Sequence, residues 1–296
     1  MRLVTFGPPG GEELGALVDD ARVVPLRPLL RRAGIPAREA TEVLAVWQSV
    51  SPLLAGVPDE ETLPLAAVRL GPPVPRPGKV VAIGFNYADH ADGVLPRAPG
   101  EPVVFLKPPE TVSGPHEPIV RPPETGQLDY ELELGVVVGR AGRRIRREDA
   151  HRHVAGYVMA NDVTARDVAL GAGLEHPLQL QIARGKGFPT FCPLGPWLST
   201  PDEFDADRPL RLRLSVNGEL RQDGSTDRML VDVPGLIASV SATMELRPGD
   251  LLLTGTPAGC GFQLDPPRYL SAGDRVDSEI TGLGRMSLVV RDETPA

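Results

Sequence analysis

The fold is decided by one stretch of sequence, Asp129-Tyr130-Glu131-Leu132-Glu133-Leu134-Gly135-Val136-Val137-Val138-Gly139. Its apolar end predicts a strand that runs into the interior. Side chains two apart in a strand share a face, so Glu131 and Glu133 point one way while Leu132 and Leu134 point the other. Adjacent carboxylates repel each other, and oxygen ligands are what Mg²⁺, Mn²⁺ or Ca²⁺ prefer. The alternation therefore leaves two interpretations open, a buried cation site or a solvated carboxylate face.

Outward from this strand, most of the chain after residue 79 has the pattern of strands, and helices are few and short. The dipeptide Asn217-Gly218 between alternating apolar residues predicts a two-residue hairpin turn. Asp232 ahead of Val233-Pro234 predicts the start of a helix, which Pro248-Gly249-Asp250 ends. The predicted strands are Val80–Ile83, Val103–Leu106, Glu131–Val138, Ala155–Ala160, Leu210–Val216, Leu251–Thr254 and Arg275–Ile280.

The first part of the chain has the pattern of a small separate unit. Short strands are expected at Arg2–Phe6 and Gly15–Val18, followed by a helix whose apolar stripe is Val43, Val46, Trp47 and Val50. A proline-rich connector follows at Leu70–Lys79, and proline favours an extended segment there because it lacks an amide donor. We therefore expect a small N-terminal domain over residues 1–72 and a larger domain over residues 73–296.

Composition limits the partners of the chain. A formal net charge of −8 over 296 residues argues against nucleic acid, whose binding depends on Lys and Arg at the phosphates, and only 4% of residues are aromatic. The start lacks the pattern of a secretory signal, and no run approaches the ~18 apolar residues of a membrane span. Cys192 and Cys260 have no metal or disulfide spacing. We expect a cytoplasmic protein with two reduced thiols that binds neither membrane nor nucleic acid.

Three further segments carry polar residues of the kind that chemistry needs. Asn161 and Asp162 end an apolar strand, where they could bind a ligand or cap a helix over Val163–Leu170. Lys186 lies between two glycines in a stiff loop, where it could stabilise an oxyanion or be solvated. His90 follows the strand Val80–Ile83; its ordinary pKa near neutrality suits a general base, but a packing role is equally open.

Together, and in this order, five blocks resemble the fumarylacetoacetate hydrolase family over nearly the whole chain. The resemblance implies an α+β fold that is mostly β, with a mixed β-roll catalytic domain after a small N-terminal domain, commonly as a homodimer. The blocks are GFNYADHA (84–91), DYELELGVVVG (129–139), NDVTARD (161–167), GKGFPTFCPLGP (185–196) and RPGDLLLTGTPAGCG (247–261).

The same resemblance assigns a site. It makes Glu131, Glu133 and Asp162 the ligands of one divalent cation, Mg²⁺ or Mn²⁺, with open positions for water and substrate. It matches Lys186 to the family lysine near the substrate oxygens and His90 to the histidine of the lid region. These two residues are the implied catalytic groups.

Family substrates are small 2-oxo or 1,3-dicarbonyl carboxylic acids, which Arg166 and Thr256 are expected to contact. A carboxylate beside a ketone offers two oxygens to a cation, which absorbs the charge of an enolate. Hydrolysis of acylpyruvates and isomerisation of 2-hydroxyhepta-2,4-diene-1,7-dioate both pass through such an enolate. The resemblance thus implies a hydrolase or isomerase; the alternatives are a decarboxylase on the same substrates and a binding protein without activity.

Three positions depart from the family pattern. Gly93 stands where hydrolytic members have a glutamate that orients the histidine, Ala169 replaces a common glutamine, and Pro189 replaces an aspartate. A positioned acid or base contributes about 10²- to 10⁴-fold in rate, so losing the partner of His90 should weaken water activation and spare enolate formation. These departures leave the choice between hydrolysis, isomerisation and decarboxylation open.

Overall fold

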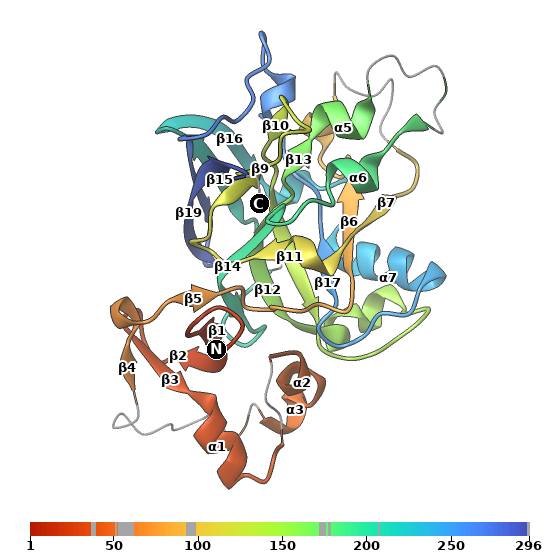
Figure 1. Cartoon of the computed structure of the whole chain (residues 1–296). Helices are drawn as coiled ribbons and strands as arrows, with labels where there is room; N and C mark the ends of the chain where they lie inside the picture. Colours follow the sequence, from red (N-terminus) through yellow and green to blue (C-terminus); the bar gives the residue numbers. More distant parts are fainter. Residues whose placement is uncertain are drawn as a thin grey trace.

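A large mixed sheet runs through the molecule in a computed structural model, which describes residues 1–36, 40–50, 52, 62–92, 99–171, 176, 179–206 and 208–294 (Figure 1). Short strands β5 (Leu70–Gly71) and β8 (Val112–Ser113) pair with β1 (Arg2–Phe6) and β14 (Cys192–Ser199) at its side. In spatial order the main strands are β4 (Leu63–Pro64), β3 (Arg22–Pro25), β2 (Glu13–Leu17), β1 (Arg2–Phe6), β14 (Cys192–Ser199), β12 (Val154–Asn161), β11 (Leu132–Val138), β17 (Leu251–Leu253), β6 (Val80–Gly84) and β7 (Val103–Lys107).

A second sheet packs against the apolar face of β11. Leu132 and Leu134 lie in one buried cluster with Leu212, Leu214 and Leu288 of this sheet. Its strands, in spatial order, are β16 (Glu219–Ser225), β15 (Arg211–Val216), β18 (Arg275–Ile280), β19 (Gly284–Asp292) and β9 (Ile119–Arg121), and a separate pair joins β10 (Leu128–Asp129) to β13 (Thr164–Ala165). Because the hydrophobic face of β11 is covered in this way, its opposite face is free to carry the site.

The helices are short and lie around the sheets. Helix α7 (Val233–Thr243) packs Leu236 and Val240 into a cluster with Val136 of β11. The other helices are α1 (Leu26–Arg32), α2 (Ala40–Ala45), α3 (Trp47–Val50), α4 (Ala88–Ala91), α5 (Arg166–Leu170) and α6 (Ile182–Gly185), with 3-10 turns η3 (Leu65–Ala67), η4 (Pro109–Thr111), η5 (Arg147–His153), η7 (Thr226–Arg228) and η8 (Gly261–Gln263). Within the described ranges, no helix has the length and apolarity to cross a membrane.

The mostly-β prediction is confirmed, and so are its local signals. Asn217 and Gly218 both have positive φ, 52° and 81°, as a two-residue hairpin turn between β15 and β16 requires. The Asp232 side chain caps α7 by accepting a hydrogen bond from Gly235 N at 3.0 Å. The hairpin turn and the helix cap could be predicted from the sequence because residues only a few positions apart determine both.

One predicted helix forms in two pieces, and one of the open alternatives is wrong. The stripe over Val43–Val50 is broken into α2 and α3, and Val46 between them is 41% exposed while Val43 and Val50 are buried. A helix capped at Asn161 or Asp162 does not form, since Thr164–Ala165 pairs with β10 and the helix begins only at Arg166. In the second case strand pairing over a long sequence separation overrides the local capping signal.

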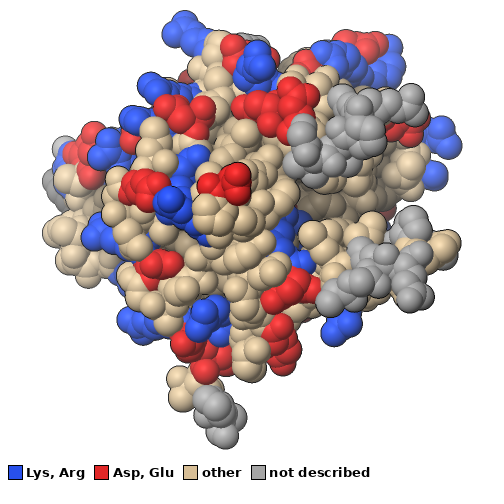
Figure 2. Space-filling view, turned by 90° about the horizontal axis from the view of Figure 1, so that it is seen from above, with Lys and Arg blue, Asp and Glu red and all other residues tan. Residues whose placement is uncertain are grey.

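The N-terminal strands extend the main sheet. Arg2 of β1 is opposite Ser199 of β14, so residues far apart in the sequence lie side by side. Acidic and basic side chains are interspersed over the face seen in Figure 2. The division into domains at residue 72 stays a prediction.

Candidate active site

The pairing of β11 with β12 brings the three predicted carboxylates together. Asp162 N donates to Glu131 O at 2.8 Å, and Glu131 N donates to the Asn161 side-chain oxygen at 2.9 Å. Carboxylate oxygens of Glu131, Glu133 and Asp162 lie within 4.8 Å of one another. The three residues are 6%, 1% and 0% exposed, so the interpretation of a solvated carboxylate face is wrong.

Two buried lysines bind these carboxylates. Lys186 Nζ donates to Glu131 Oε2 at 2.8 Å, to Asp162 Oδ2 at 2.6 Å and to Thr164 Oγ1 at 2.8 Å, so the lysine is not a solvated loop residue. Lys107 Nζ donates to the other oxygen of Asp162 at 2.6 Å, from the end of β7. Burying a charge is unfavourable unless it is paired, and each lysine is paired here.

Arg166 joins a fourth carboxylate to the group. Its Nε donates to Asp129 Oδ2 at 2.9 Å and its Nη2 to Glu131 Oε1 at 2.5 Å. The guanidinium lies 4.2 Å from the centre of the Phe262 ring, in cation–π contact. Arg166 was predicted to bind substrate; it borders the cavity but is already engaged by two carboxylates, and its substrate role stays a prediction.

Glu133 differs from its neighbours in its partners and its pKa. It accepts a hydrogen bond from Gly255 N at 2.7 Å, and no ion pair to it is found among the described residues. Burial raises the pKa of Glu133 well above its ordinary value, and the Asp162 and Glu131 carboxylates add to the rise. Burial would also raise the pKa of Glu131, but the Lys186 and Arg166 cations outweigh it and hold that pKa below the usual range.

These partners show a local deficit of positive charge. Four buried carboxylates face three buried cations, with Glu133 as the member that lacks one; the carboxylates are Asp129, Glu131, Glu133 and Asp162, and the cations are Lys107, Arg166 and Lys186. A divalent cation between Glu133 and its two neighbours would supply the missing charge. The donor set of three carboxylates suits a hard cation, so the residues present fit the group that the sequence predicts.

His90 lies across the site in a partly apolar setting. It stacks on Phe85 with ring centres 5.6 Å apart and meets the edge of Phe262 at 5.9 Å. Burial lowers the pKa of His90, so its imidazole is neutral at pH 7. Its Nδ1 lies 3.2 Å from Gln263 Oε1, an oxygen that also accepts from the amides of Gly259 and Cys260. Nδ1 therefore carries the proton, and Nε2 is left free to act as a base.

A cavity of about 310 Å³ opens over these groups. Glu131, Glu133, Arg166, Lys186 and Thr256 supply its polar floor, and its remaining walls are mainly apolar. The apolar lining residues are Ile83, Phe85, Val103, Val104, Phe105, Ala169, Leu170, Leu180, Ile182 and Phe262. A compact polar end in an apolar enclosure is the usual form of a small-molecule site.

Thr256 borders this cavity, but its hydroxyl is engaged within the protein. Its Oγ1 donates to Leu132 O at 2.9 Å and accepts from Gln222 Nε2 at 2.8 Å. One lone pair is left for a substrate donor. Contact between Thr256 and substrate stays a prediction.

Sequence reasoning missed two members of the group, Lys107 and Asp129. A signal existed for each: Lys107 ends an apolar strand just before Pro108, and Asp129 is two residues before Glu131 on the same face. Gly93, the departure near His90, lies outside the described residues. Ala169 is buried in the cavity wall, so the missing glutamine leaves that wall apolar.

Comparisons with known proteins agree with this geometry. The family pattern described as fumarylacetoacetate (FAA) hydrolase C-terminal matches residues 79–291. Oxaloacetate tautomerase FAHD2B, mitochondrial, of Bos taurus is 44% identical over 222 residues, which cover 75% of this chain and 69% of that protein.

Solved structures extend the similarity to the whole chain. A probable 2-hydroxyhepta-2,4-diene-1,7-dioate isomerase from Mycobacterium abscessus is 45% identical, with a TM-score of 0.83 and 100% of both chains covered. Maleylpyruvate hydrolase from Sphingobium sp. SYK-6, in complex with manganese(II) and pyruvate, is 31% identical with a TM-score of 0.78, over 99% of this chain and 100% of that one. The fold, the buried carboxylate group and the matched residues make this chain an enzyme of the fumarylacetoacetate hydrolase family.

Proposed function

We propose that the chain is a divalent-metal-dependent enzyme that isomerises a small 2-oxo or 1,3-dicarbonyl carboxylic acid through its enolate. One observation carries the proposal: three buried carboxylates converge, two of them, Glu131 and Glu133, line the cavity, and Glu133 has no ion pair within the described part of the chain. The name of the tautomerase relative supports the reaction class.

Glu131, Glu133 and Asp162 would hold the cation, with Mg²⁺ or Mn²⁺ as the candidates. The manganese(II) in the maleylpyruvate hydrolase structure supports this choice, and both ions accept an all-oxygen ligand set. A divalent cation supplies a Lewis acid for the two oxygens of a 2-oxo acid.

Lys186 and His90 would then stabilise the negative charge on the substrate and transfer its proton. The Lys186 ammonium lies at 2.8 Å or less from Glu131 and Asp162, where it favours negative charge on a nearby substrate oxygen. His90, neutral and with Nε2 unprotonated, takes a proton from the carbon beside the ketone and returns it to another position. Isomerisation of this kind consumes no water, so it does not depend on a carboxylate partner at position 93.

The apolar walls indicate what the rest of the substrate is like. Val103 and Phe105 of β7 and Leu170 of α5 line the cavity. A cavity of about 310 Å³ has room for a short carbon chain beyond the 2-oxo acid. We therefore expect a compact substrate with its polar end at Lys186 and a carbon chain against β7 and α5.

A substrate panel tests the proposal. Purified enzyme is assayed with oxaloacetate for keto–enol exchange, with 2-hydroxy dienoic acids for double-bond movement and with acylpyruvates for cleavage, each with Mg²⁺ and after chelation. The expected result is metal-dependent isomerisation or tautomerisation that exceeds cleavage. Turnover that survives chelation, or no turnover of any member, would contradict the proposal.

Hydrolysis is the second candidate, favoured by the similarity to maleylpyruvate hydrolase over nearly the full chain. Gly93→Glu would place a carboxylate three residues after His90, where hydrolytic members of the family carry one. Acylpyruvate cleavage should rise in this variant while isomerisation changes little. Rapid cleavage by the unmodified enzyme, lost in Gly93→Glu, would make hydrolysis the principal reaction. A homodimer and a cytoplasmic location stay predictions.

A further inference from the structure

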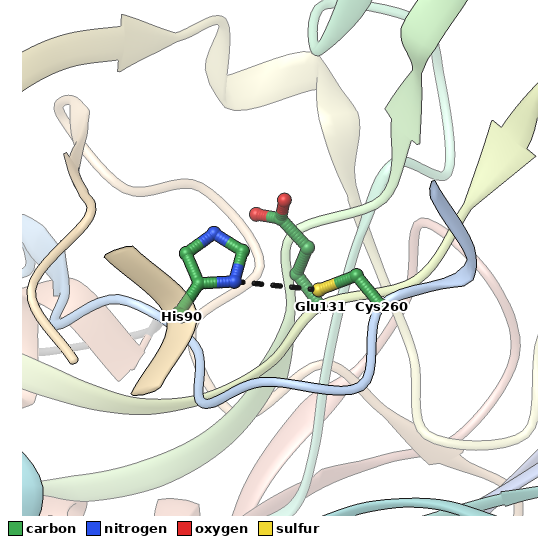
Figure 3. A group of neighbouring side chains, drawn as sticks. All are labelled: His90, Glu131 and Cys260. Carbon is green, nitrogen blue, oxygen red and sulfur yellow. Dashed lines mark hydrogen bonds between the residues drawn. The ribbon is translucent and has the colours of Figure 1, made fainter. Parts of the chain in front are cut away.

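A second group of potential ligands lies beside Glu131, Glu133 and Asp162, and one of its members, Cys260, has no part in the proposed reaction. His90, Glu131 and Cys260 offer ligand atoms that all lie within 4.8 Å of one another, and all three residues are buried. Figure 3 shows the imidazole of His90 and the thiol of Cys260 facing each other beside the Glu131 side chain. They come from three separate segments, after β6, before β11 and after β17.

The chemistry of this group differs from that of the carboxylate site. A nitrogen, a sulfur and an oxygen donor suit Zn²⁺ or another soft cation, whereas Mg²⁺ prefers oxygen alone. Zn–N and Zn–S bonds at tetrahedral angles separate the two donor atoms by about 3.6 Å. Nδ1 of His90 and Sγ of Cys260 are 3.9 Å apart, close to that separation.

The backbone holds Cys260 in place, so the group does not depend on a mobile side chain. Gly261 N, next to it, donates to Asp129 Oδ1 at 2.7 Å. Gln263 Oε1 accepts from Cys260 N at 3.3 Å and from Gly259 N at 3.1 Å, and it keeps both bonds if His90 Nδ1 turns to a metal. The cavity borders His90 and Glu131, which gives a cation a route in and a water molecule to complete four ligands.

We propose that His90 Nδ1, Cys260 Sγ and a Glu131 oxygen form an inhibitory binding site for Zn²⁺. This site shares Glu131 with the cation site of Glu131, Glu133 and Asp162. Binding releases the thiol proton to solvent, and the thiolate becomes the sulfur ligand. The imidazole changes tautomer, because Nδ1 gives its lone pair to the metal and Nε2 takes the proton.

Two consequences follow for activity. His90 with a proton on Nε2 no longer has a free nitrogen on the cavity side, so it stops acting as a base. Glu131 bound to Zn²⁺ is withdrawn from the cation that it shares with Glu133 and Asp162. Zinc should therefore inhibit even when Mg²⁺ is saturating.

Cobalt spectroscopy tests the site without any assay of activity. Co²⁺ substitutes for Zn²⁺ and shows a sulfur-to-metal charge-transfer band in the near ultraviolet when a thiolate binds it, whereas an all-oxygen site gives none. The enzyme is first stripped of bound metal and then saturated with Mg²⁺. Titration with Co²⁺ should then produce this band, with one equivalent of Co²⁺ bound. Cys192→Ala, which removes the other buried thiol, should keep the band, and Cys260→Ser should lose it.

Zinc inhibition gives the second measurement. Cys260→Ser keeps the size of the side chain, and Zn²⁺ should inhibit this variant at least tenfold more weakly than wild type. Cys260→Ala should behave in the same way, with the melting temperature of each variant confirming the fold. Absence of the cobalt band in wild type, a band that persists in Cys260→Ser, or equal zinc inhibition of wild type and variants would overturn the proposal. Because the cobalt band does not depend on turnover, failure of the proposed reaction leaves this test valid.

Discussion

Lys186 joins two carboxylates that would otherwise repel each other, so its loss has effects on both reaction and fold. Lys186→Met should lower turnover by about an order of magnitude or more, because charge that develops on substrate loses its partner. Glu131 and Asp162 each lose a buried ion pair, and breaking a buried pair costs about 3–5 kcal/mol of stability.

Mg²⁺ should partly offset this destabilisation of Lys186→Met, since it supplies positive charge to the same carboxylates. The measurement compares turnover and melting temperature of the variant with and without Mg²⁺. Lys79→Met is the control, because Lys79 pairs with Asp250 away from the cavity. Wild-type turnover in Lys186→Met would show that the lysine has only a structural role.

The two cysteines, as single residues, predict how the reactivity of the buried thiols depends on pH. Burial raises the pKa of Cys192 to about 12, and burial together with the Glu131 carboxylate raises the pKa of Cys260 well above its ordinary value. Only the thiolate reacts quickly with thiol reagents. At pH 8 the folded, metal-free protein should therefore leave both thiols unreacted, and denaturant should expose both.

The raised pKa values of the two thiols also determine how the stability of the fold changes with pH. Both thiols ionise in the unfolded chain near the ordinary value of about 9.0 and stay protonated in the folded chain. The unfolded state thus loses protons first, and stability should fall as pH rises above that value. A fast reaction of either thiol in folded protein at pH 8 would contradict this account.

At the scale of elements, β11 explains why the sequence was informative about the site. Its period of two placed Glu131 and Glu133 on one face and Leu132 and Leu134 on the other, as observed. The ion pairs of Lys107 and Arg166 were not predictable, because strand periodicity does not show which distant side chains meet. Local signals likewise failed where long-range pairing decided the outcome, as at Thr164–Ala165.

The turn after β17 offers a matched pair of glycine substitutions. Gly259 has φ of +104°, and a Cβ there would lie 2.0 Å from the backbone oxygen of Arg221. Gly218 has φ of +81°, but a Cβ there meets nothing within 4 Å. Both alanine variants carry the backbone strain of about 1–2 kcal/mol, and only Gly259→Ala adds a collision.

Gly259→Ala should therefore lower the melting temperature more than Gly218→Ala does. It should also reduce turnover, because this turn carries Thr256 and the amides that bind Gln263, the partner of His90. Denaturant unfolding and turnover of both variants provide the comparison. Equal stability of the two variants would show that the backbone at Gly259 can shift to accept a Cβ without disturbing the site.

At the scale of the whole molecule, the site draws on segments that the sequence keeps far apart. The neighbouring strands β7, β6, β17, β11 and β12 of one sheet bring together Lys107, Glu131, Asp162 and Gly255, and Lys186 joins them from the end of α6. The resemblance to a family predicted that the matched blocks converge. It did not predict the charge deficit at Glu133, which only the complete set of ion pairs reveals.

That deficit gives the cation a role in stability as well as in the reaction. A ligand that binds only the folded state at 100 times its Kd stabilises it by about 2.7 kcal/mol, which corresponds to a rise of roughly 4 °C in the melting temperature of a chain of this size. Glu133→Gln keeps an oxygen that accepts the Gly255 amide but removes the charge. The variant should therefore fold and lose the metal response.

The melting temperature of metal-free enzyme, with and without Mg²⁺ or Mn²⁺, tests the central claim most directly. We predict that either ion raises the melting temperature of the wild-type enzyme, that chelation reverses the rise, and that Glu133→Gln shows a much smaller one. Identical melting curves for wild-type enzyme with Mg²⁺, Mn²⁺ and chelator, together with no metal bound at equilibrium, would contradict a cation site at Glu131, Glu133 and Asp162.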